Sequence, residues 1–229
     1  MRPGIATLVA PCLLVCAATR SSAQGADSLT AEQRSLIDGG GQLFLTEPLP
    51  GSPWPRARAF QYIDATPEEA AAVFADYERQ TTYIPGVKKS KIARVVDRGT
   101  AEVDYTLAVP VLPDEHYTVR DSVSADGAGG GYRVDWVLLR ASSTKATVGN
   151  ARFVPHRNER TGRDGTLFIY TNFVTPGSRL AGLGFVKARA LRQMRETVSA
   201  VVRQVEAERR ADPALLQRQV AELRAAVGR

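Results

Sequence analysis

Residues 63–87 read IDATPEEAAAVFADYERQTTYIPGV, and this stretch carries the clearest local signal in the chain. Thr66, Pro67 and Glu69 stand where an N-cap residue, a proline at the first helical position and a capping-box glutamate belong. Apolar residues then follow at helical spacing: Ala70, Val73, Phe74 and Tyr77. The stretch therefore predicts an amphipathic helix over residues 67–79.

Strand-like sequence lies on both sides of this helix. Residues 42–47 and 56–64 each predict one strand before it. Residues 87–175 alternate between apolar and polar with a period of two, which predicts five or six further strands. The apolar positions include Val103, Tyr105, Leu107, Tyr117, Val119, Val123, Tyr132, Val134, Trp136, Ala151, Phe153, Phe168 and Tyr170. Because short polar or glycine-rich turns connect these strands, we expect an antiparallel meander.

Helical patterns occupy both ends of the chain. Residues 27–38 predict a short helix, in which Thr30 and Gln33 fit a capping box and the glycines at 39–41 end the helix. The helical pattern at the C-terminal end of the chain covers more residues than this short helix does.

The C-terminal pattern predicts a long helix over residues 179–209 with a single apolar stripe. The stripe consists of Leu183, Val186, Ala190, Met194, Val198, Val201 and Val205. Asp212 and Pro213 then begin a further helix that extends to about residue 228.

Length and composition predict one domain, or two small ones. Of the 229 residues, 44% are apolar and 24% are charged, so the chain can bury a core without disulfides or metal. No apolar run reaches the ~18 residues needed to cross a bilayer, which excludes a polytopic membrane protein.

The first residues have the features of a secretory signal. Arg2 is followed by an apolar stretch over residues 5–18, and small residues at 21–23 predict cleavage after Ala23. A lipoprotein modified at Cys16 and an uncleaved anchor stay open as alternatives. Cleavage would remove both cysteines of the chain, which excludes disulfides and thiolate sites in the mature protein. We therefore expect a secreted or periplasmic protein.

The order of the elements fits an α+β, helix-grip architecture. In it, a curved antiparallel sheet wraps around the long C-terminal helix and leaves a cavity between them. A short N-terminal helix and a C-terminal helical extension complete the arrangement. The expected divisions are 1–23 for the signal peptide, 24–41 for an N-terminal helical segment, 42–209 for the ligand-binding domain and 210–229 for the extension.

Three short runs resemble the opening of START-like (SRPBCC) proteins. They are Ile63–Glu69, Asp76–Glu78 and Tyr83–Val87, with Phe74 between the first two, and the resemblance extends over about residues 40–207. This superfamily contains polyketide cyclases, coenzyme Q-binding proteins and lipid-transfer domains. The resemblance implies the helix-grip fold, but it leaves the activity open because the superfamily contains both carriers and enzymes.

A helix-grip cavity would be lined by apolar and aromatic side chains with a few orienting polar groups. The candidates share inward positions on the predicted strands and helices. They are Phe74, Tyr77, Tyr105, Tyr117, Trp136, Phe153, Phe168, Tyr170, Asn172, Val186 and Met194, and Tyr132 is considered with them. The alternative for each aromatic residue is that it simply fills the core.

No motif for enzymatic chemistry is present. The chain has no Gly-x-Ser-x-Gly elbow, phosphate loop or His-Glu-x-x-His motif, and residues 127–132 predict a turn and not a dinucleotide site. Asp114, Glu115 and His116 point alternately to opposite faces of a strand, so we expect a solvated strand start there. His156 is expected in an exposed loop. We nominate no catalytic residues, metal site or cofactor.

Basic residues gather at the C-terminal end. Without Arg2 and Arg20 the chain has 28 basic and 24 acidic residues, a net charge of +4. Residues 185–229 contain ten Lys or Arg against five Asp or Glu. A transient contact with an anionic membrane would use Lys187, Arg192, Arg195 and Arg203. The alternative is an ordinary solvated helix face, and no nucleic-acid partner is expected.

Together these patterns predict an exported protein that holds a hydrophobic small molecule, such as a lipid or isoprenoid, for transport or sequestration. One alternative is a cyclase/aromatase-type enzyme on the same fold. Another is a structural or assembly factor without a ligand, in which the helix at 212–228 contacts a partner. The oligomeric state stays open.

Overall fold

The sheet has eight antiparallel strands in the order β1-β2-β8-β7-β6-β5-β4-β3. The computed structural model describes residues 29–109, 113–127, 129–177 and 184–228, so the predicted signal segment lies outside the described residues. The strands are β1 (Leu43–Glu47), β2 (Arg56–Ile63), β3 (Val87–Asp97), β4 (Thr100–Leu107), β5 (Glu115–Asp126), β6 (Gly131–Ala141), β7 (Thr144–Arg157) and β8 (Asp164–Pro176). Strand β8 pairs with β2, so the β1 and β2 pair extends the β3–β8 meander at β8, and β1 and β3 are the two edges of the sheet.

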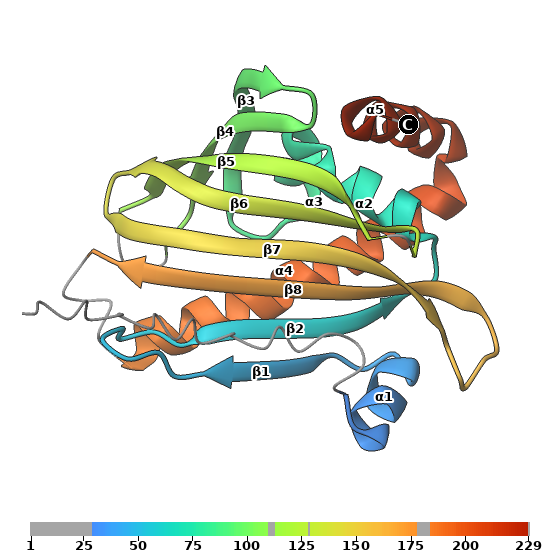
Figure 1. The fold of residues 1–229 in the computed structure, drawn as a ribbon. Coiled ribbons are helices and arrows are strands. Elements are labelled where there is room, and N and C mark those ends of the chain that lie inside the picture. Colours follow the sequence, from blue (N-terminus) through green and yellow to red (C-terminus); the bar gives the residue numbers. More distant parts are fainter. Residues whose placement is uncertain (1–28, 110–112, 128, 178–183, 229) are drawn as a thin grey trace, which may run out of the picture.

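The curved sheet wraps around the long helix α4 (Gly184–Ala211), as Figure 1 shows. Helix α2 (Pro67–Ala75) covers the concave face beside α4, and α5 (Pro213–Val227) packs on α2. Helix α1 (Ala31–Asp38) lies at the β1 and β2 end of the sheet. This arrangement confirms the predicted α+β, helix-grip architecture with helices added at both ends.

The predicted helix at 67–79 is shorter than expected. Its capping box is present, since the Thr66 hydroxyl accepts from the Glu69 N–H and the Glu69 carboxylate accepts from the Thr66 N–H. The helix ends at Ala75, and the chain continues as a 3₁₀ helix, η2 (Tyr77–Arg79), and a short α3 (Gln80–Tyr83). The Gln80 side chain donates to the carbonyl of Phe74, 2.9 Å away. A continuous helix would use that carbonyl for its own ladder.

The terminal helices follow their sequence patterns closely. Helix α1 has the predicted capping box between Thr30 and Gln33. The part of the predicted long helix before Gly184 lies outside the described residues. Helix α5 begins where the Asp212 carboxylate accepts from the Leu215 N–H, and it ends at Gly228 in the left-handed conformation.

Two hydrophobic clusters hold these layers together. The larger one lies between the concave face of the sheet and helices α2, α4 and α5, and it includes Phe153, Phe168 and Val201. The smaller one, around Phe60 and Ile37, packs α1 against the opposite face of the sheet at β2 and β8. Among the described residues, no helix is long and apolar enough to cross a membrane.

Candidate ligand-binding cavity

A cavity of about 650 Å³ lies between the concave face of the sheet and the first half of α4. Its volume falls within the range of about 300–1,000 Å³ that small-molecule sites occupy. Six strands, β3 to β8, contribute to its wall together with α2, α3, the α3–β3 loop and α4. The side chains on this wall include Phe74, Gln80, Pro85, Tyr105, Glu115, Tyr117, Val119, Asp121, Trp136, Ser143, Thr144, Tyr170, Asn172, Phe185, Val186, Arg189, Ala190, Gln193, Met194 and Thr197.

Aromatic rings form most of the sheet side of the cavity. Tyr105 and Tyr117 are directly paired across β4 and β5, and their rings stack with centroids 5.3 Å apart. The rings of Trp136 and Tyr170 lie 5.1 Å apart. A Cβ atom at Gly149 would stand 2.4 Å from the Trp136 ring, so the glycine opposite Trp136 allows the indole to lie across β7. The sheet therefore presents a flat apolar surface to the cavity.

One stripe of α4 forms the facing wall. Val186, Ala190, Met194 and Thr197 succeed one another at intervals of three or four residues, which places them on one face of the helix. Each of these four side chains is half-buried, whereas Val198 and Val201 further along the same helix are fully buried. The first half of α4 thus borders empty space on the side that faces the sheet.

The packing of α4 against the sheet explains this empty space. Among the strands, α4 contacts β2 most extensively, and hydrogen bonds from Gln42 to Ser199 and from Gln42 to Gln61 join the two elements. The helix therefore leans on one side of the curved sheet. The concave surface of β4, β5 and β6 is left uncovered beneath its first half.

Most of the predicted lining residues lie on this cavity wall. They are Phe74, Tyr105, Tyr117, Trp136, Tyr170, Asn172, Val186 and Met194. The structure brings them together from α2, four strands and α4. Their role in holding a ligand stays a prediction.

Tyr77, Phe153 and Phe168 do not line the cavity, which corrects the sequence-based placement. Phe153 and Phe168 are fully buried and stack with centroids 4.9 Å apart. Tyr77 is buried in the same core and borders a separate, smaller cavity of about 180 Å³ near α5. The aromatic side chain of Tyr132, on the same sheet face, is also buried, and its hydroxyl donates to Glu68 at 2.8 Å.

The physical reason for this correction is the position of α2. This helix contacts β6, β7 and β8 and presses the Phe74 ring against the sheet, with the Phe153 centroid 5.7 Å away. Inward-facing residues beneath α2 are therefore in close-packed core. Inward-facing residues on the other side of Phe74 border the cavity.

Several polar side chains on the wall bond to one another or to the backbone. The Tyr105 hydroxyl donates to Gln80 at 3.0 Å, and the Trp136 indole N–H donates to Asn172 at 3.2 Å. The Gln193 amide donates to the carbonyl of Pro85 at 3.3 Å, which fastens the α3–β3 loop to α4.

Glu115 corrects the expected solvated strand start, because it is buried while the neighbouring His116 is exposed. Its carboxylate accepts from the Ser143 hydroxyl and from the backbone N–H groups of Ser143 and Thr144. Desolvation by burial opposes these hydrogen bonds, and the net result is a lowered pKa of Glu115. The side chain thus closes the β6–β7 turn at one end of the cavity.

Asp121 is the functional candidate that sequence reasoning missed. It lies on β5, on the same face as Tyr117 and Val119, and only 4% of its surface is exposed. Its Oδ2 atom has no hydrogen-bond partner in the described structure. The signal was present in the sequence, since an acidic residue at 121 interrupts the apolar positions 117, 119 and 123.

Burial raises the pKa of Asp121 from 3.8 to about 8. Burial first, and the Asp121 carboxylate second, also raise the pKa values of Tyr77, Tyr105 and Tyr170. The phenols around Asp121 therefore stay neutral at physiological pH. The carboxyl group itself titrates near that pH.

Exposed wall residues mark the opening of the cavity. They are Ser143 at the β6–β7 turn, with Phe185 and Arg189 at the start of α4. Phe185 is 62% exposed, which is unusual for a large apolar side chain. The predicted membrane-surface residues Lys187, Arg192, Arg195 and Arg203 are all exposed, and the Arg195 guanidinium lies 4.2 Å from the centroid of the Phe44 ring.

The two histidines do not form a metal site. His156 corrects the expected exposed loop position, because it lies on β7 and its Nε2 atom is 2.7 Å from the carboxylate of the buried Asp38. His116 bonds to the Thr106 hydroxyl on the outer face of β5. Within the described ranges, no group of three histidine, cysteine or acidic residues is arranged to hold a metal ion.

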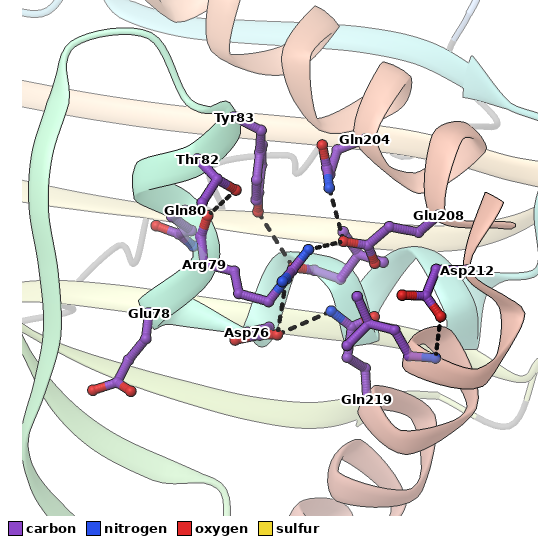
Figure 2. Close-up of polar contacts among 12 residues, drawn as sticks. Asp76, Glu78, Arg79, Gln80, Thr82, Tyr83, Gln204, Glu208, Asp212 and Gln219 are labelled. Carbon is purple, nitrogen blue, oxygen red and sulfur yellow. Dashed lines mark hydrogen bonds and ion pairs between the residues drawn. The ribbon is translucent and has the colours of Figure 1, made fainter.

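The second half of α4 is held by a polar network away from the cavity (Figure 2). Arg79 donates to the buried carboxylate of Glu208 at 3.1 Å and lies 3.7 Å from Asp76. Gln204 also donates to Glu208, and Gln219 of α5 donates to Asp76. The network joins η2, α4 and α5, so the sequence run that opens with Asp76 anchors both C-terminal helices.

Comparison with solved structures identifies the fold. A STAR-related lipid transfer protein from Xanthomonas axonopodis matches with a TM-score of 0.61 at 16% identity, covering 72% of this chain and 94% of the other. Human StAR-related lipid transfer protein 5 matches with a TM-score of 0.60 at 13% identity, covering 73% and 83%. A Streptomyces aromatase/cyclase matches with a TM-score of 0.55 at 15% identity, covering 68% and 96%.

These likenesses confirm that the chain has the START-like (SRPBCC) fold, as the resemblance of residues 63–87 implied. The fold is shared by lipid transfer proteins and aromatase/cyclases. No protein-family model matches the sequence, and no curated protein is similar enough in sequence to count as a match.

Proposed function

We propose that this protein binds a hydrophobic small molecule, a lipid or an isoprenoid, in the cavity beneath α4. The observation that carries the proposal is the 650 Å³ space itself, which is walled by aromatic rings on one side and by a half-buried helix stripe on the other. The fold of lipid transfer proteins supports the same conclusion. Transfer of each CH₂ group from water into such a space contributes about 0.8 kcal/mol, so a long chain binds without specific chemistry.

The proposal includes a role outside the cytoplasm, in transport or sequestration. It is supported by the basic Arg2, the apolar stretch at 5–18 and the small residues before Gln24. We expect a mature N-terminus at Gln24 in the extracytoplasmic fraction, which N-terminal sequencing would measure. Intact Met1 on cytosolic protein would contradict export and favour the enzyme alternative.

The proposal also includes a transient contact with an anionic membrane at the opening of the cavity. Exposed Phe185 precedes the exposed Arg189 and Arg192 by four and seven residues on α4, so an apolar group and two cations lie on one side of the helix, and exposed Lys187 adds a third cation to its first turns. Each Lys or Arg near an anionic surface contributes about 1 kcal/mol. Sedimentation with vesicles of phosphatidylglycerol should exceed sedimentation with phosphatidylcholine, and K187E/R192E should abolish the difference. Equal sedimentation with both vesicles would indicate an ordinary solvated face.

Mass spectrometry of an organic extract from natively purified protein tests the central proposal. We expect a hydrophobic molecule in stoichiometric amount from the wild type and none from Met194→Trp, in which an indole occupies the cavity. A folded wild type that carries no such molecule, and that binds none when lipids are offered, would contradict the proposal. Conversion of the bound molecule to a product during incubation would instead support the cyclase/aromatase alternative.

A further inference from the structure

A second, smaller cavity lies between α5 and the β3–β4 hairpin, and its volume is about 180 Å³. Helix α2, η2 and β5 complete its wall, and we call this site the α5 pocket. The wall includes Ala72, Val95, Asp97, Val123, Glu222 and Ala226. The α5 pocket shares no described wall residue with the large cavity, and Figure 1 shows α5 away from the start of α4. It is therefore separate from the proposed lipid site.

Much of the α5 pocket is apolar. Ala72 of α2, Val123 of β5 and the buried Leu223 of α5 contribute to its wall. Val95 of β3 is 70% exposed, the largest exposed fraction among the large apolar side chains of the described residues. Ile92 lies on the same face of this edge strand and is 36% exposed. Exposed apolar side chains beside an apolar pocket with a polar rim are typical of an interaction site.

The charged residues on the wall of the α5 pocket are all acidic. They are Asp76, Asp97 and Glu222, and no lysine or arginine belongs to the described wall. Asp76 is compensated from inside the molecule, because Arg79 lies 3.7 Å away and Gln219 donates to it at 2.9 Å. The side chains of Asp97 and Glu222 are exposed, and neither has an ion pair or a hydrogen bond within the described residues. Because the whole chain has a net charge of +6, this acidic wall departs from the average charge of the molecule.

The arginines on the neighbouring elements do not neutralise these carboxylates. The Nη1 atom of Arg98, at the β3–β4 turn, lies 3.5 Å from the position that a Cβ atom at Gly228 would occupy, so the side chain extends toward the end of α5. Arg224 of α5 donates to the Glu68 carboxylate of α2 at 2.8 and 2.6 Å. Arg218 is exposed on α5 and does not belong to the wall. The two exposed wall carboxylates thus have no cationic partner in the described structure.

We infer that the α5 pocket binds a lysine or arginine side chain of a protein partner. Such a side chain combines an apolar stem with a cationic head, so the stem packs on Val95 and the apolar wall while the head pairs with Asp97 and Glu222. A volume of 180 Å³ is below the range of about 300–1,000 Å³ that small-molecule sites occupy, and it suits one side chain. Side chains that anchor in small pockets, arginine among them, are typical of protein interfaces. A partner bound here leaves the large cavity free.

The test is an NMR titration of isotope-labelled full-length protein with two capped pentapeptides. One is acetyl-Ser-Val-Arg-Val-Ser-amide, and the other has citrulline, which has nearly the same shape but no charge, in place of arginine. At low salt, the arginine peptide should shift the amide signals of Gly99, Thr100 and Ala226 in a saturable manner, because these residues line the pocket. It should bind at least ~5-fold more tightly than the citrulline peptide, and added salt should reduce this difference.

Three variants complete the design. Asp97→Asn combined with Glu222→Gln changes two exposed positions, so it should fold, and it should bind the two peptides with equal, weakened affinity. The matched control is Glu32→Gln combined with Glu159→Gln, which removes two exposed carboxylates outside the pocket and should bind both peptides as the wild type does. Ala226→Phe fills the pocket without a change of charge and should abolish binding of the arginine peptide.

Three results would overturn the inference. Equal binding of both peptides by the wild type would indicate an apolar surface without selectivity for a cation. A preference for arginine that persists in the variant without the Asp97 and Glu222 carboxylates would place the cation elsewhere. Absence of saturable shifts at the α5 pocket would mean that it does not hold such a side chain. None of these results bears on the proposed lipid site, because the two cavities share no described wall residue.

Discussion

The concave face of the sheet has two regions that differ in how they are covered. The packed end lies under α2 and contains Tyr132, Phe153 and Phe168, all of them buried. The cavity end lies under the first half of α4 and contains Tyr105, Tyr117 and Trp136 around a 650 Å³ space. Aromatic residues at alternate strand positions line both ends. The difference shows that the helix above a strand position determines whether a residue there fills core or borders a cavity.

The same contrast appears within α4. Its second half buries Val198, Val201 and Val205 and is held by the bond between Arg79 and the buried Glu208 (Figure 2). Its first half presents Val186 and Met194 to the cavity, and both are only half-buried. One helix thus serves as a fixed core element at one end and as the wall of a binding site at the other.

The largest expected effect concerns pH and the cavity end. The folded chain keeps the Asp121 proton up to about pH 8, while the unfolded chain releases it near 3.8. Folded protein therefore loses stability relative to unfolded protein as the pH rises between these values, by up to about 1.4 kcal/mol per pH unit. Asp121→Asn has no carboxyl proton to release, so it should not lose stability in this way. The free energy of unfolding of the variant, relative to that of the wild type, should therefore increase from pH 4 to pH 8. Urea denaturation of both proteins across this range measures the difference, and parallel curves would show that Asp121 is not buried as described.

The next largest effect concerns the packed end. Phe153→Ala should reduce the free energy of unfolding by about 3–5 kcal/mol, because the ring is fully buried between Phe74 and Phe168. Chemical denaturation provides the measurement. A loss below about 1 kcal/mol would mean that the packed end contains a cavity too.

A smaller effect is expected at the network that fixes the second half of α4. Arg79→Met leaves the buried Glu208 carboxylate without its cationic partner, and this change should reduce the free energy of unfolding by about 2 kcal/mol. The matched control is Arg210→Met, whose exposed side chain lies 3.9 Å from Glu206 and should contribute less than about 0.5 kcal/mol. Equal losses in the two variants would argue against an anchoring role for Arg79.

The smallest stability effect is expected at the cavity wall of α4. Met194→Ala should cost less than about 1 kcal/mol, because the side chain already borders empty space. On the buried half of the same helix, Val201→Ala should cost more than about 2 kcal/mol, although it removes fewer atoms. Thermal and chemical denaturation would compare the two. A larger loss in the free energy of unfolding at Met194 than at Val201 would mean that the first half of α4 is packed in the core and the second half borders the cavity.

Much of the fold could be predicted from local chemistry. Thr66, Pro67 and Glu69 indicate where α2 begins, because caps and prolines act through the adjacent backbone groups. The period of two assigns Tyr105, Tyr117 and Trp136 to one face, since strand side chains alternate by geometry alone. The sequence pattern predicts the end of α2 at residue 79, four residues beyond the observed end at Ala75, because the bond from Gln80 to the Phe74 carbonyl that competes with the helix is formed by a side chain.

The candidate site was predicted less completely. Asp121 could be assigned to the inward face from its spacing, but its missing partner depends on groups from other strands and helices. Glu115 was expected in solvent and His156 in a loop, and both are instead held by distant segments at Ser143 and Asp38. Long-range pairings of this kind leave no periodic trace in the sequence.

The sequence by itself determined the periods, caps and turns, and through them the α+β, helix-grip order of elements. Only the tertiary structure decided how far along each strand the core ends and the cavity begins. Period two assigns Phe153 and Trp136 to the same inward face and cannot distinguish them. The distinction arises because α2 presses Phe74 onto one end of the sheet while α4 leans toward β2 at the other. The direction of a side chain is a local property of the backbone, whereas the cavity depends on how helices from distant parts of the chain pack against the sheet.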